Sequence, residues 1–331
     1  MVDIDLKDRK ILYQLDLNCR QSNAQIGKKV GLSKQVVDYR IKRMEEDGII
    51  KGYWTAIDTM KLGYYIYRIY ISFQNITEDI KNEIIKYFVE YKRSLTIVSI
   101  KGPIDCDVIV WVDDVFEFNQ FWNKTMEKYG NYFSQNVISN VTHFLQFCKH
   151  FLIYENETNK SEDYTIDCRG NPITIDEFDY KLLNEIVINA RIPLIELADR
   201  LQCSSQTVNY RIKNLIDKGL IKKFRVDINL SKFGLHDYLI NIFLKDYSKK
   251  QNIIEYIKCQ PYVDCIVDSQ MGWTDLQIEV FCKNIDNLLQ IMEEIDKKFT
   301  GAIRKQEYWI TTERHKERWL PEMTGADFKK T

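Results

Sequence analysis

Residues 33–44 of the 331-residue chain read SKQVVDYRIKRM, and residues 204–215 repeat the pattern as SSQTVNYRIKNL. Each copy begins with a serine suited to cap a helix, and its apolar residues then recur at helical spacing. Around this match, a shift of 171 positions aligns residues 5–63 with residues 176–234 without a gap. Since the agreement extends over helix, turn and loop signals alike, the sequence predicts two copies of one structural unit.

The first part of each unit is predicted to contain three short helices and a ribbon. Asp5 is a suitable N-cap for a first helix, and Ser22 opens a second helix with a capping-box pattern. Ser33 caps the third helix, and Gly48 stands at its C-terminal end. The β-favouring residues 49–57 then form a small ribbon or wing. This order is typical of a winged helix-turn-helix, whose third helix enters the DNA major groove.

The outward face of the third helix supplies candidate DNA-binding residues in both copies. Val37, Ile41 and Met44 form its apolar face in the first copy, so the side chains between them point outward. Gln and Asn side chains pair with adenine edges, whereas Lys and Arg reach guanine or phosphate. The candidates are Lys34, Gln35, Tyr39, Arg40, Lys42, Arg43, Ser205, Gln206, Asn209, Arg211 and Lys213. Tyr39 and Tyr210 are expected to brace the helix or contact the DNA backbone rather than read a base.

Local charge supports DNA binding, although the whole chain has a net charge of −1. Residues 28–51 contain 7 basic and 4 acidic side chains, and residues 200–225 contain 7 basic and 1 acidic side chain. Basic charge is therefore concentrated where phosphate contacts are expected. The alternative is that these cations only solvate an exposed helix face. For Arg40 and Arg211, a phosphate contact and a role in helix packing both stay open.

The second part of each unit alternates strands and helices in the order β-α-β-β-α-β, which is the ferredoxin-like order. In the first copy we expect strands at 65–73, 95–100, 107–112 and 136–148, and helices at 77–92 and 114–129. In the second copy we expect strands at 238–244, 263–270, 276–282 and 303–311, and helices at 249–259 and 285–299. The two helices of each copy cover one sheet face, so the other face must be buried by a partner.

The predicted fold class is α+β, with two copies of a winged helix-turn-helix followed by a ferredoxin-like sensor domain. Between the copies lies a polar, turn-rich segment that we interpret as an exposed linker, with a short hairpin around Gly170. The expected boundaries are helix-turn-helix 1–60, sensor 61–153, linker 154–173, helix-turn-helix 174–231 and sensor 232–331.

Composition argues against several other classes of protein. The 8 cysteines contain no Cys-x-x-Cys pair, so we expect small core residues rather than disulfides or zinc ligands. No Gly-rich phosphate loop or nucleophile elbow is present, and we expect no cofactor, no metal and no ordinary enzyme activity. The apolar runs are shorter than the ~18–20 residues of a membrane span. Without a leader pattern at the N-terminus, we expect a soluble cytoplasmic protein without a membrane partner.

Each half resembles the Lrp/AsnC (leucine-responsive, feast/famine) family of transcriptional regulators, here as two fused copies. The resemblance rests on Asp5-x-x-Asp8, Asn18-x-Arg20, Leu32-Ser33, Arg40-Ile41, Gly48-Ile49-Ile50, Leu62-Gly63 and Gly102-x-x-Asp105, and it is looser in the C-terminal part. It implies a DNA-binding domain followed by an effector-sensing, dimerising domain. In relatives the effector is often an amino acid.

The resemblance also implies effector pockets near the Gly-x-x-Asp turns. The effector-binding candidates are Gly102, Asp105, Gly272 and Asp275. A turn glycine and an aspartate that caps it need no ligand, so a purely structural role is the alternative. Because Trp273 stands in the second turn and Pro103 in the first, the two pockets are not expected to be equivalent.

A fused chain can pair its own two sensor domains and so act as an intramolecular pseudo-dimer on double-stranded DNA. Fusion raises the effective concentration of the second reading helix without any new contact. The reading helices differ, with Lys34-Gln35-Val36 in one and Ser205-Gln206-Thr207 in the other. We therefore expect an asymmetric operator with unlike half-sites. Acidic sensor surfaces could also stack into larger homo-oligomers.

Two other functions are consistent with this architecture. Siroheme decarboxylases share it, occur as pairs and fusions, and work without DNA. Such an enzyme would need cationic and histidine side chains around an anionic tetrapyrrole, but no cluster is evident among His143, His150, His236 and His315. The other alternative is a co-regulator whose helix-turn-helix makes only protein contacts, and the basic residues of both wings argue against it.

Overall fold

The computed structural model describes residues 4–153, 164–168 and 172–322. The first helix-turn-helix unit consists of α1 (Leu6–Asn18), α2 (Asn23–Val30) and α3 (Lys34–Glu46), followed by β1 (Ile50–Ile57). The second consists of α6 (Glu177–Ile188), α7 (Leu194–Arg200) and α8 (Ser205–Asp217), followed by β7 (Ile221–Ile228). The predicted three helices and following strand are therefore present in both copies.

The helix starts follow the predicted caps. Asp5 and Ser22 each form a complete capping box, and the Ser33 hydroxyl accepts a hydrogen bond from Val36 N. In the turn before α3, Gly31 has a positive φ of 69°. Gln202 occupies the equivalent position of the second copy with a φ of 53°. This backbone conformation is less favourable for a residue with a Cβ than for glycine.

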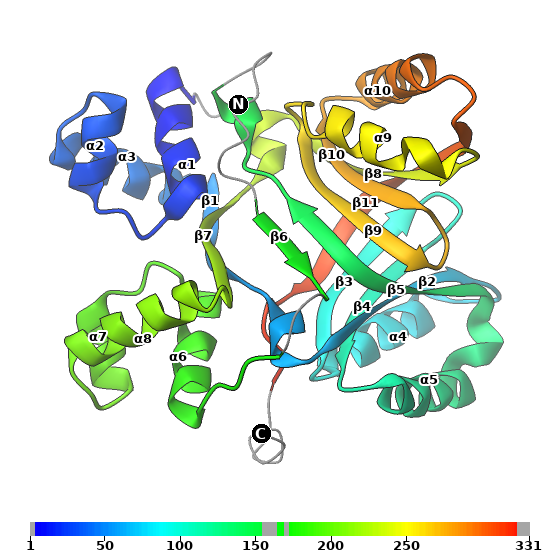
Figure 1. Ribbon diagram of the computed structural model, residues 1–331, viewed down its shortest axis with the longest axis horizontal. Helices are drawn as coiled ribbons and strands as arrows, with labels where there is room; N and C mark the ends of the chain where they lie inside the picture. Colours follow the sequence, from blue (N-terminus) through cyan, green and yellow to red (C-terminus); the bar gives the residue numbers. More distant parts are fainter. Residues whose placement is uncertain (1–3, 154–163, 169–171, 323–331) are drawn as a thin grey trace.

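The ribbon differs from the prediction, because it is not built within one copy. β1 pairs antiparallel with β7 of the other copy, with Thr55 opposite Phe224 in the middle of the register. Figure 1 shows this two-stranded sheet running between the two helix-turn-helix units. A single strand cannot satisfy its own backbone groups, so each copy completes the wing of the other.

The sensor parts contain the predicted elements, with small shifts at most of their ends and a longer last strand than the predicted 303–311. In the first copy they are β2 (Tyr65–Phe73), α4 (Glu78–Glu90), β3 (Ser94–Lys101), β4 (Cys106–Val112), α5 (Val115–Tyr129) and β5 (Phe133–Gln146). In the second they are β8 (His236–Leu244), α9 (Lys250–Ile257), β9 (Val263–Met271), β10 (Leu276–Cys282), α10 (Ile285–Lys298) and β11 (Ile303–Glu317). The strand orders β5-β2-β4-β3 and β11-β8-β10-β9 confirm the ferredoxin-like arrangement.

The two sensor sheets close into one barrel because β5 and β11 continue beyond their own sheets. β5 pairs with β2 through residues 133–141 and with β9 through residues 140–146. β11 likewise pairs with β8 through residues 303–310 and with β3 through residues 310–317. The ring therefore runs β2-β4-β3-β11-β8-β10-β9-β5 and back to β2. Helices α4 and α5 lie outside one half of the barrel, and α9 and α10 lie outside the other (Figure 1).

The prediction of an exposed linker at residues 154–173 is partly wrong. Its residues 164–167 form strand β6, which pairs with β5 and extends the barrel wall. Tyr164 and Ile166 are buried there, because their side chains join an apolar cluster with β1 and β9 residues. The hairpin predicted around Gly170 lies outside the described residues.

The helix-turn-helix units share one apolar core that includes Ile11 and Leu15 of the first copy and Leu182 and Ile186 of the second. Because residues of β1 and β7 also belong to this core, the two units pack against one another and are not joined by the chain alone. Among the described residues, no helix is both long enough and apolar enough to cross a membrane.

Candidate nucleic-acid interface

Helices α3 and α8 each bury one face and expose the other. Val37, Ile41 and Met44 are the buried residues of α3, as the periodicity predicts. Val208, Ile212 and Leu215 are the buried residues of α8, at equivalent positions. Figure 1 places both helix-turn-helix units on one side of the molecule, with the barrel on the other side of the ribbon. The outward faces of the two reading helices are therefore clear of the sensor barrel.

The candidate DNA-binding residues fall into two groups. The first group is exposed and consists of Lys34, Gln35, Tyr39, Lys42, Gln206, Asn209 and Lys213. Ser205 at the start of α8 is half-buried, and its hydroxyl lies 3.5 Å from the Leu194 carbonyl oxygen as a hydrogen-bond donor. This group has the side chains that can reach base edges and phosphates in a groove.

The second group consists of arginines held by the first helix of their own unit. Arg40 Nη1 lies 2.8 Å from both the Asp5 and the Asp8 carboxylate, and these carboxylates raise the pKa of Arg40. Arg43 pairs with the same buried Asp8. In the second copy, Arg211 Nη1 pairs with Asp176 at 2.7 Å and with Asp179 at 3.2 Å. These ion pairs fix the reading helix against the helix before it, which is the packing role that the sequence left open for Arg40 and Arg211.

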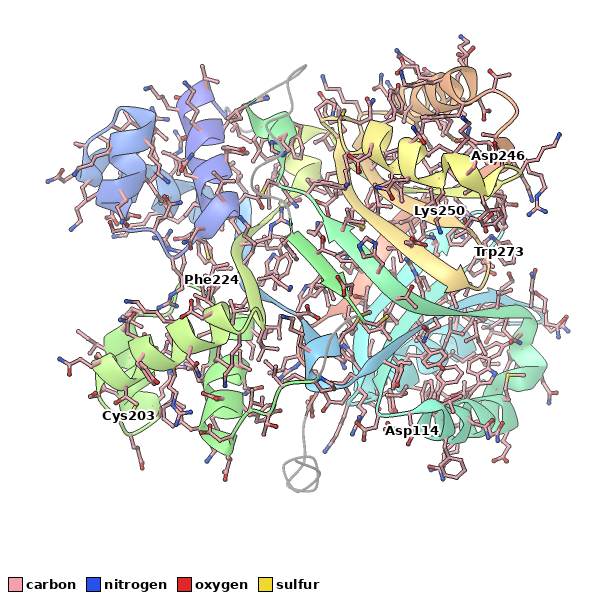
Figure 2. The ribbon with its side chains drawn as sticks, viewed as in Figure 1. Asp114, Cys203, Phe224, Asp246, Lys250 and Trp273 are labelled. Atoms are coloured by element: carbon pink, nitrogen blue, oxygen red, sulfur yellow. The ribbon has the colours of Figure 1, made fainter. Side chains whose placement is uncertain are left out.

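Matched contacts across the ribbon join the two helix-turn-helix units. Cys19 N donates to the Phe224 carbonyl oxygen at 2.8 Å, and Ala190 N donates to the Tyr53 carbonyl oxygen at 3.1 Å. These two bonds are related by the 171-position repeat. Phe224 lies on the ribbon between the units, as Figure 2 shows. The two units therefore pack as a pseudo-symmetric pair within one chain.

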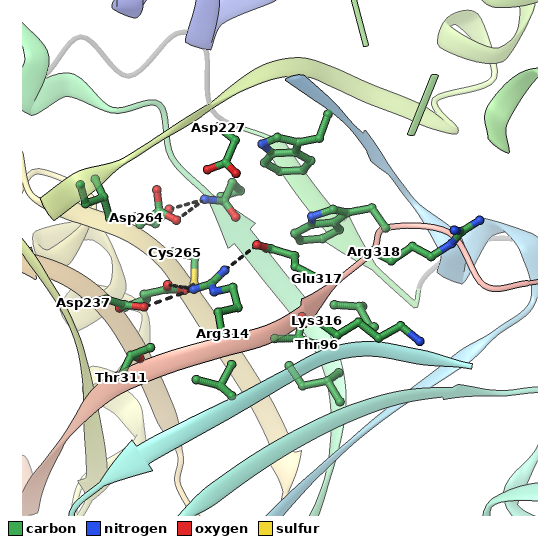
Figure 3. A pocket seen from close by; sticks show the side chains of 18 of the residues that line it. Thr96, Asp227, Asp237, Asp264, Cys265, Thr311, Arg314, Lys316, Glu317 and Arg318 are labelled. Atoms are coloured by element: carbon green, nitrogen blue, oxygen red, sulfur yellow. Dashed lines mark hydrogen bonds and ion pairs between the residues drawn. The ribbon is translucent and has the colours of Figure 1, made fainter. Parts of the chain in front are cut away.

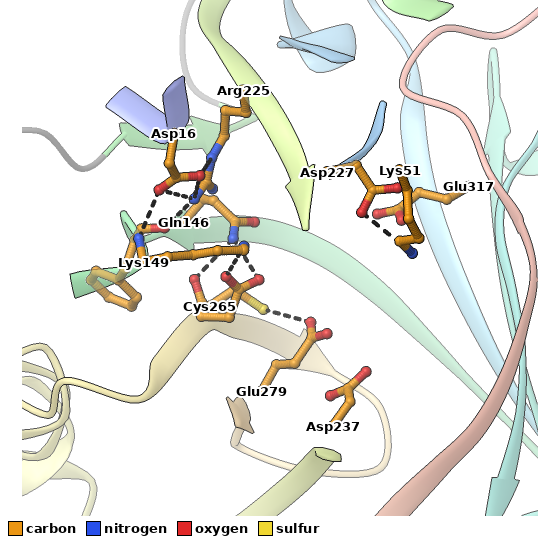
Figure 4. Close-up of polar contacts among 12 residues, drawn as sticks. Asp16, Lys51, Gln146, Lys149, Arg225, Asp227, Asp237, Cys265, Glu279 and Glu317 are labelled. Atoms are coloured by element: carbon orange, nitrogen blue, oxygen red, sulfur yellow. Dashed lines mark hydrogen bonds and ion pairs between the residues drawn. The ribbon is translucent and has the colours of Figure 1, made fainter. Parts of the chain in front are cut away.

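One contact at this junction breaks the repeat. The Arg225 guanidinium donates to both oxygens of Asp16, with the closest atoms 2.7 Å apart, and the exposed fractions of the two side chains are 1% and 0%. Burial lowers the pKa of Arg225, but the Asp16 carboxylate acts together with Tyr164, Cys148 and Asp264, and the net pKa is raised. Trp54 and Val187 occupy the equivalent positions. Figure 4 shows the pair beside Gln146 and Lys149 at the end of β5.

The aspartates of the Gly-x-x-Asp turns stabilise the ends of neighbouring strands. Asp105 Oδ2 accepts from Phe73 N at 2.8 Å, and Asp275 Oδ2 accepts from Leu244 N at 2.7 Å, so each carboxylate caps the end of a strand. Trp273, in the second turn, lies at the barrel end far from the helix-turn-helix units (Figure 2).

The glycines of these turns lie against the long strand of the other copy. Gly102 has a φ of +151°, and a Cβ added there would lie 3.0 Å from Trp309 of β11. Gly272 has a φ of +147°, and a Cβ there would lie 1.8 Å from Ser139 Oγ of β5. Both positions require glycine for close packing. The role in effector binding that the resemblance implies stays a prediction.

A large cavity lies elsewhere, between the barrel interior and the ribbon. It has a volume of about 920 Å³, and its wall includes residues of β1, β7 and the barrel strands (Figure 3). None of the four Gly-x-x-Asp candidates lines it. The sequence prediction missed this cavity, although one signal was available. Asp237 and Glu279 of its wall stand where the first copy has Ile66 and Ile109, so charge replaces an apolar residue at two interior strand positions.

Comparisons with known proteins agree with this geometry. A family model described as winged helix-turn-helix DNA-binding matches residues 4–51 and 175–222. The transcriptional regulator LrpB of Bacillus subtilis is 30% identical over 131 residues, which cover 40% of this chain and 86% of LrpB. The chain belongs to the Lrp/AsnC family of DNA-binding transcriptional regulators.

Other relatives of this Lrp/AsnC-family protein match over shorter stretches. The proline dehydrogenase transcriptional activator of Rhodobacter capsulatus is 45% identical over 60 residues, which cover 18% of this chain and 39% of the activator. Among solved structures, the siroheme decarboxylase NirDL has a TM-score of 0.64 at 13% identity and covers 98% of this chain, with 96% of its own chain matched. At that identity the likeness concerns the fold alone.

Proposed function

We propose that the chain acts as an intramolecular pseudo-dimer, which presents α3 and α8 together to one DNA duplex. The observation that carries this proposal is the pair of matched bonds from Cys19 to Phe224 and from Ala190 to Tyr53, because they hold the two units in a pseudo-twofold relation. Dimeric helix-turn-helix proteins read half-sites about one helical turn, ~34 Å, apart. Residues 1–60 and 174–231 then serve as the two DNA-binding domains, and residues 61–153 and 232–331 as the sensor domains.

The exposed residues suggest distinct roles at the two half-sites. Lys34 and Gln35 open α3, whereas Ser205 and Gln206 open α8, so the two helices present different groups to base edges. Lys42 and Lys213 lie further along the exposed faces and suit phosphate contacts. Arg40, Arg43 and Arg211 position the helices through their aspartates. A small effector, such as an amino acid, would modulate binding through the sensor domains.

The test is fluorescence anisotropy of the full chain on its own upstream DNA and on scrambled DNA across a salt series. Tighter binding to the upstream DNA, with affinity that falls steeply with salt, supports a sequence-reading regulator. Lys213→Ala should weaken binding to both DNAs and reduce the salt slope by about 1, since it removes one phosphate contact. Lys181→Ala, on an exposed face of α6, is the matched control and should change neither quantity. Equal binding to both DNAs, or none, contradicts the proposal.

A siroheme decarboxylase activity is the second candidate, because the fold resembles NirDL over nearly the whole chain. One solved form of NirDL is a complex with an iron-uroporphyrin III analogue, a ligand rich in carboxylates. In this chain both acidic and basic side chains line the large cavity, and the group of Asp237, Glu279 and Glu317 around Arg314 disfavours such a ligand on that side. A shift in the absorption spectrum of added siroheme would favour the enzyme, and an unchanged spectrum the regulator.

A further inference from the structure

The large cavity has one apolar side. Trp54 of the ribbon stacks on Trp319 of the C-terminal segment, with ring centroids 5.0 Å apart and an interplanar angle of 15°. Phe144 of β5 packs on Trp319 with ring centroids 6.0 Å apart. Ile66 and Ile109 line the cavity and belong to the same apolar cluster. This side suits the hydrocarbon or aromatic part of a ligand.

The other side of the cavity is charged. Arg314 of β11 forms ion pairs with Glu317 at 2.8 Å, with Glu279 of β10 at 3.0 Å and with Asp237 of β8 at 3.2 Å. The exposed fractions of the Asp237 and Glu279 side chains are only 13% and 17%. Figure 3 shows the Arg314 guanidinium between Asp237 and Glu317 at the cavity wall. One cation therefore faces three carboxyl groups, and Glu279 and Glu317 outnumber Arg314 even when Asp237 holds a proton.

These charges break the repeat of the two copies. Asp237, Glu279 and Arg314 occupy the positions that Ile66, Ile109 and Phe144 occupy in the first copy. In a dimer of identical chains, both halves of the cavity would carry the same residues. The fused chain can instead group three carboxyl groups around one cation in one half, whereas the charged residues of the other half, Arg68 and Asp107, pair with one another.

The neighbouring cations have other partners than these carboxyl groups, and Arg68 of β2 pairs with Asp107 of β4. Lys149 pairs with Asp264 at 2.9 Å, and Lys51 pairs with Asp227 at 3.4 Å (Figure 4). Lys316 points away from the carboxylates in Figure 3, and its Nζ donates to backbone carbonyl oxygens of the α4 end. Arg318 also points away, since its guanidinium donates to the Leu320 carbonyl oxygen and to Asn184.

Two buried acceptors at the same wall lack a hydrogen-bond partner. Gln277, of which 1% is exposed, lies two residues from Glu279 on the same face of β10, and its Oε1 has no partner. Oδ1 of Asp237 also has none. A buried acceptor without a partner is costly, and a ligand with N–H donors would satisfy both. Among the described residues, no three His, Cys, Asp or Glu side chains are placed to hold a metal ion, which favours an organic cation.

We propose that this cavity binds a small organic cation, an amine or guanidinium compound with an apolar body. Its cationic group lies among Asp237, Glu279 and Glu317, and its apolar part lies against Phe144, Trp54 and Trp319. The volume of about 920 Å³ falls in the range of sites for small molecules.

The position of the site indicates what binding would do. The cavity wall includes Tyr53 and Trp54 of β1 and Val226 and Asp227 of β7, the two strands that join the helix-turn-helix units. An occupant would therefore contact the ribbon and the sensor barrel at once. If the chain is the regulator proposed above, the cation is its effector. The role as effector rests on the proposed function, whereas the binding of the cation does not.

The first experiment measures binding to the full chain without DNA, by isothermal titration calorimetry and by tryptophan fluorescence. The probes are phenethylamine, agmatine, spermidine, 3-phenylpropionate and MgCl₂. We expect phenethylamine to bind at one site per chain, and 3-phenylpropionate to bind at least tenfold more weakly because its charge is reversed. Absence of binding by every amine at 10 mM, or equal binding by the anion or by Mg²⁺, overturns the proposal.

The second experiment replaces the charged side by the residues of the first copy. Asp237→Ile with Glu279→Ile should weaken phenethylamine binding at least tenfold. Glu279→Gln alone should also weaken this binding. Asp246→Asn, at a surface cap outside the cavity wall, is the matched control and should keep the affinity. Unfolding midpoints check that each variant is folded, and unchanged affinity in folded variants overturns the site. Loss of DNA binding with intact amine binding would instead refute only the regulator.

Discussion

The ion pair of Asp16 and Arg225 joins α1 of the first copy to β7 of the second without contact with solvent. Arg225 also donates to the Phe147 carbonyl oxygen at 2.9 Å, so the guanidinium links the helix, the ribbon and the end of β5. Removing one partner of a buried pair leaves the other charged and desolvated. The pair therefore stabilises the junction of the two copies together with the shared apolar core and the pairing of β1 with β7.

We expect Arg225→Met to lower the free energy of unfolding by roughly 3–5 kcal/mol, the usual cost of an unpaired buried charge. Urea unfolding followed by circular dichroism measures this change. Arg200→Met is the matched control, since Arg200 makes its ion pairs at the surface with half of its side chain exposed. It should change the free energy of unfolding far less than Arg225→Met does, because exposed ion pairs contribute little to stability. Similar losses in both variants would contradict the role given to Arg225.

Asp237 makes stability depend on pH in the opposite sense to an aspartate whose pKa is lowered by folding. Burial raises the pKa of Asp237 well above its usual value, and the Glu279 carboxylate raises it further. Arg314 and Thr311 lower the pKa but do not cancel this rise. Glu317 lies on the far side of Arg314. The folded state then binds a proton more tightly than the unfolded state. Stability is full below the unfolded pKa and falls as the pH rises toward the folded pKa.

Asp237→Asn removes this titration. Its unfolding midpoint should exceed that of the native chain at pH 7, and the difference should shrink as the pH falls toward 4. Asp246→Asn is the control of opposite sign, since hydrogen bonds from Ser248 lower the pKa of Asp246. That variant should lose stability at pH 7 and approach the native chain in acid. Thermal melts from pH 4 to 8 measure both trends, and parallel curves would refute the assignment to Asp237.

At the level of elements, local periodicity predicted nearly every helix and strand but not how strands from different copies meet. β2 was predicted with its observed bounds, because its alternate residues Ile69 and Ile71 pack with helices of the same copy. β11 was predicted to end at residue 311, yet it continues to Glu317. Its last residues are charged because they face a polar cavity and solvent rather than an apolar core. The pairing of β1 with β7 is equally invisible to local patterns, since the strands lie some 170 residues apart in sequence.

The candidate interface was predictable to a similar extent. Exposure of Lys34, Gln35 and Lys213 follows from the spacing of the apolar residues in each reading helix. The ion pairs of Arg40 with Asp5 and Asp8 do not follow, because they join residues about 35 positions apart whose approach depends on the packing of α3 against α1. Spacing predicts which face is exposed, and tertiary packing decides which exposed cations are already paired.

The C-terminal half of β11 closes the barrel, so its removal should open an edge. A chain that ends at Ile310 loses the pairing of β11 with β3 and leaves one edge of β3 unpaired, while the other edge stays paired with β4. We expect faster hydrogen exchange in β3, a lower unfolding midpoint and larger assemblies by light scattering. A chain that ends at Glu322 keeps every described strand and serves as the control. Unchanged exchange and mass in the shorter chain would show that closure does not depend on this segment.

At the scale of the whole molecule, fusion has allowed the two copies to diverge in three places that face one another. The reading helices begin with different residues, the ribbon junction holds Arg225 opposite Trp54, and the cavity has three carboxyl groups around one arginine on one side only. A homodimer would carry each of these changes twice. The two copies thus pack together through matched contacts, while their reading helices, ribbon strands and cavity residues differ.

The asymmetry of the reading helices gives a direct prediction for DNA. We expect sites selected from random DNA by the native chain to have unlike half-sites, because α3 begins with Lys34 and Val36 and α8 begins with Ser205 and Thr207. Ser205→Lys with Thr207→Val gives both helices the same opening residues and should shift the selected sites toward symmetry. The reciprocal variant, Lys34→Ser with Val36→Thr, should shift them toward the other half-site. A symmetric site for the native chain would mean that these residues do not read bases, and two variants with unchanged sites would assign specificity to groups common to both helices, such as Gln35 and its counterpart.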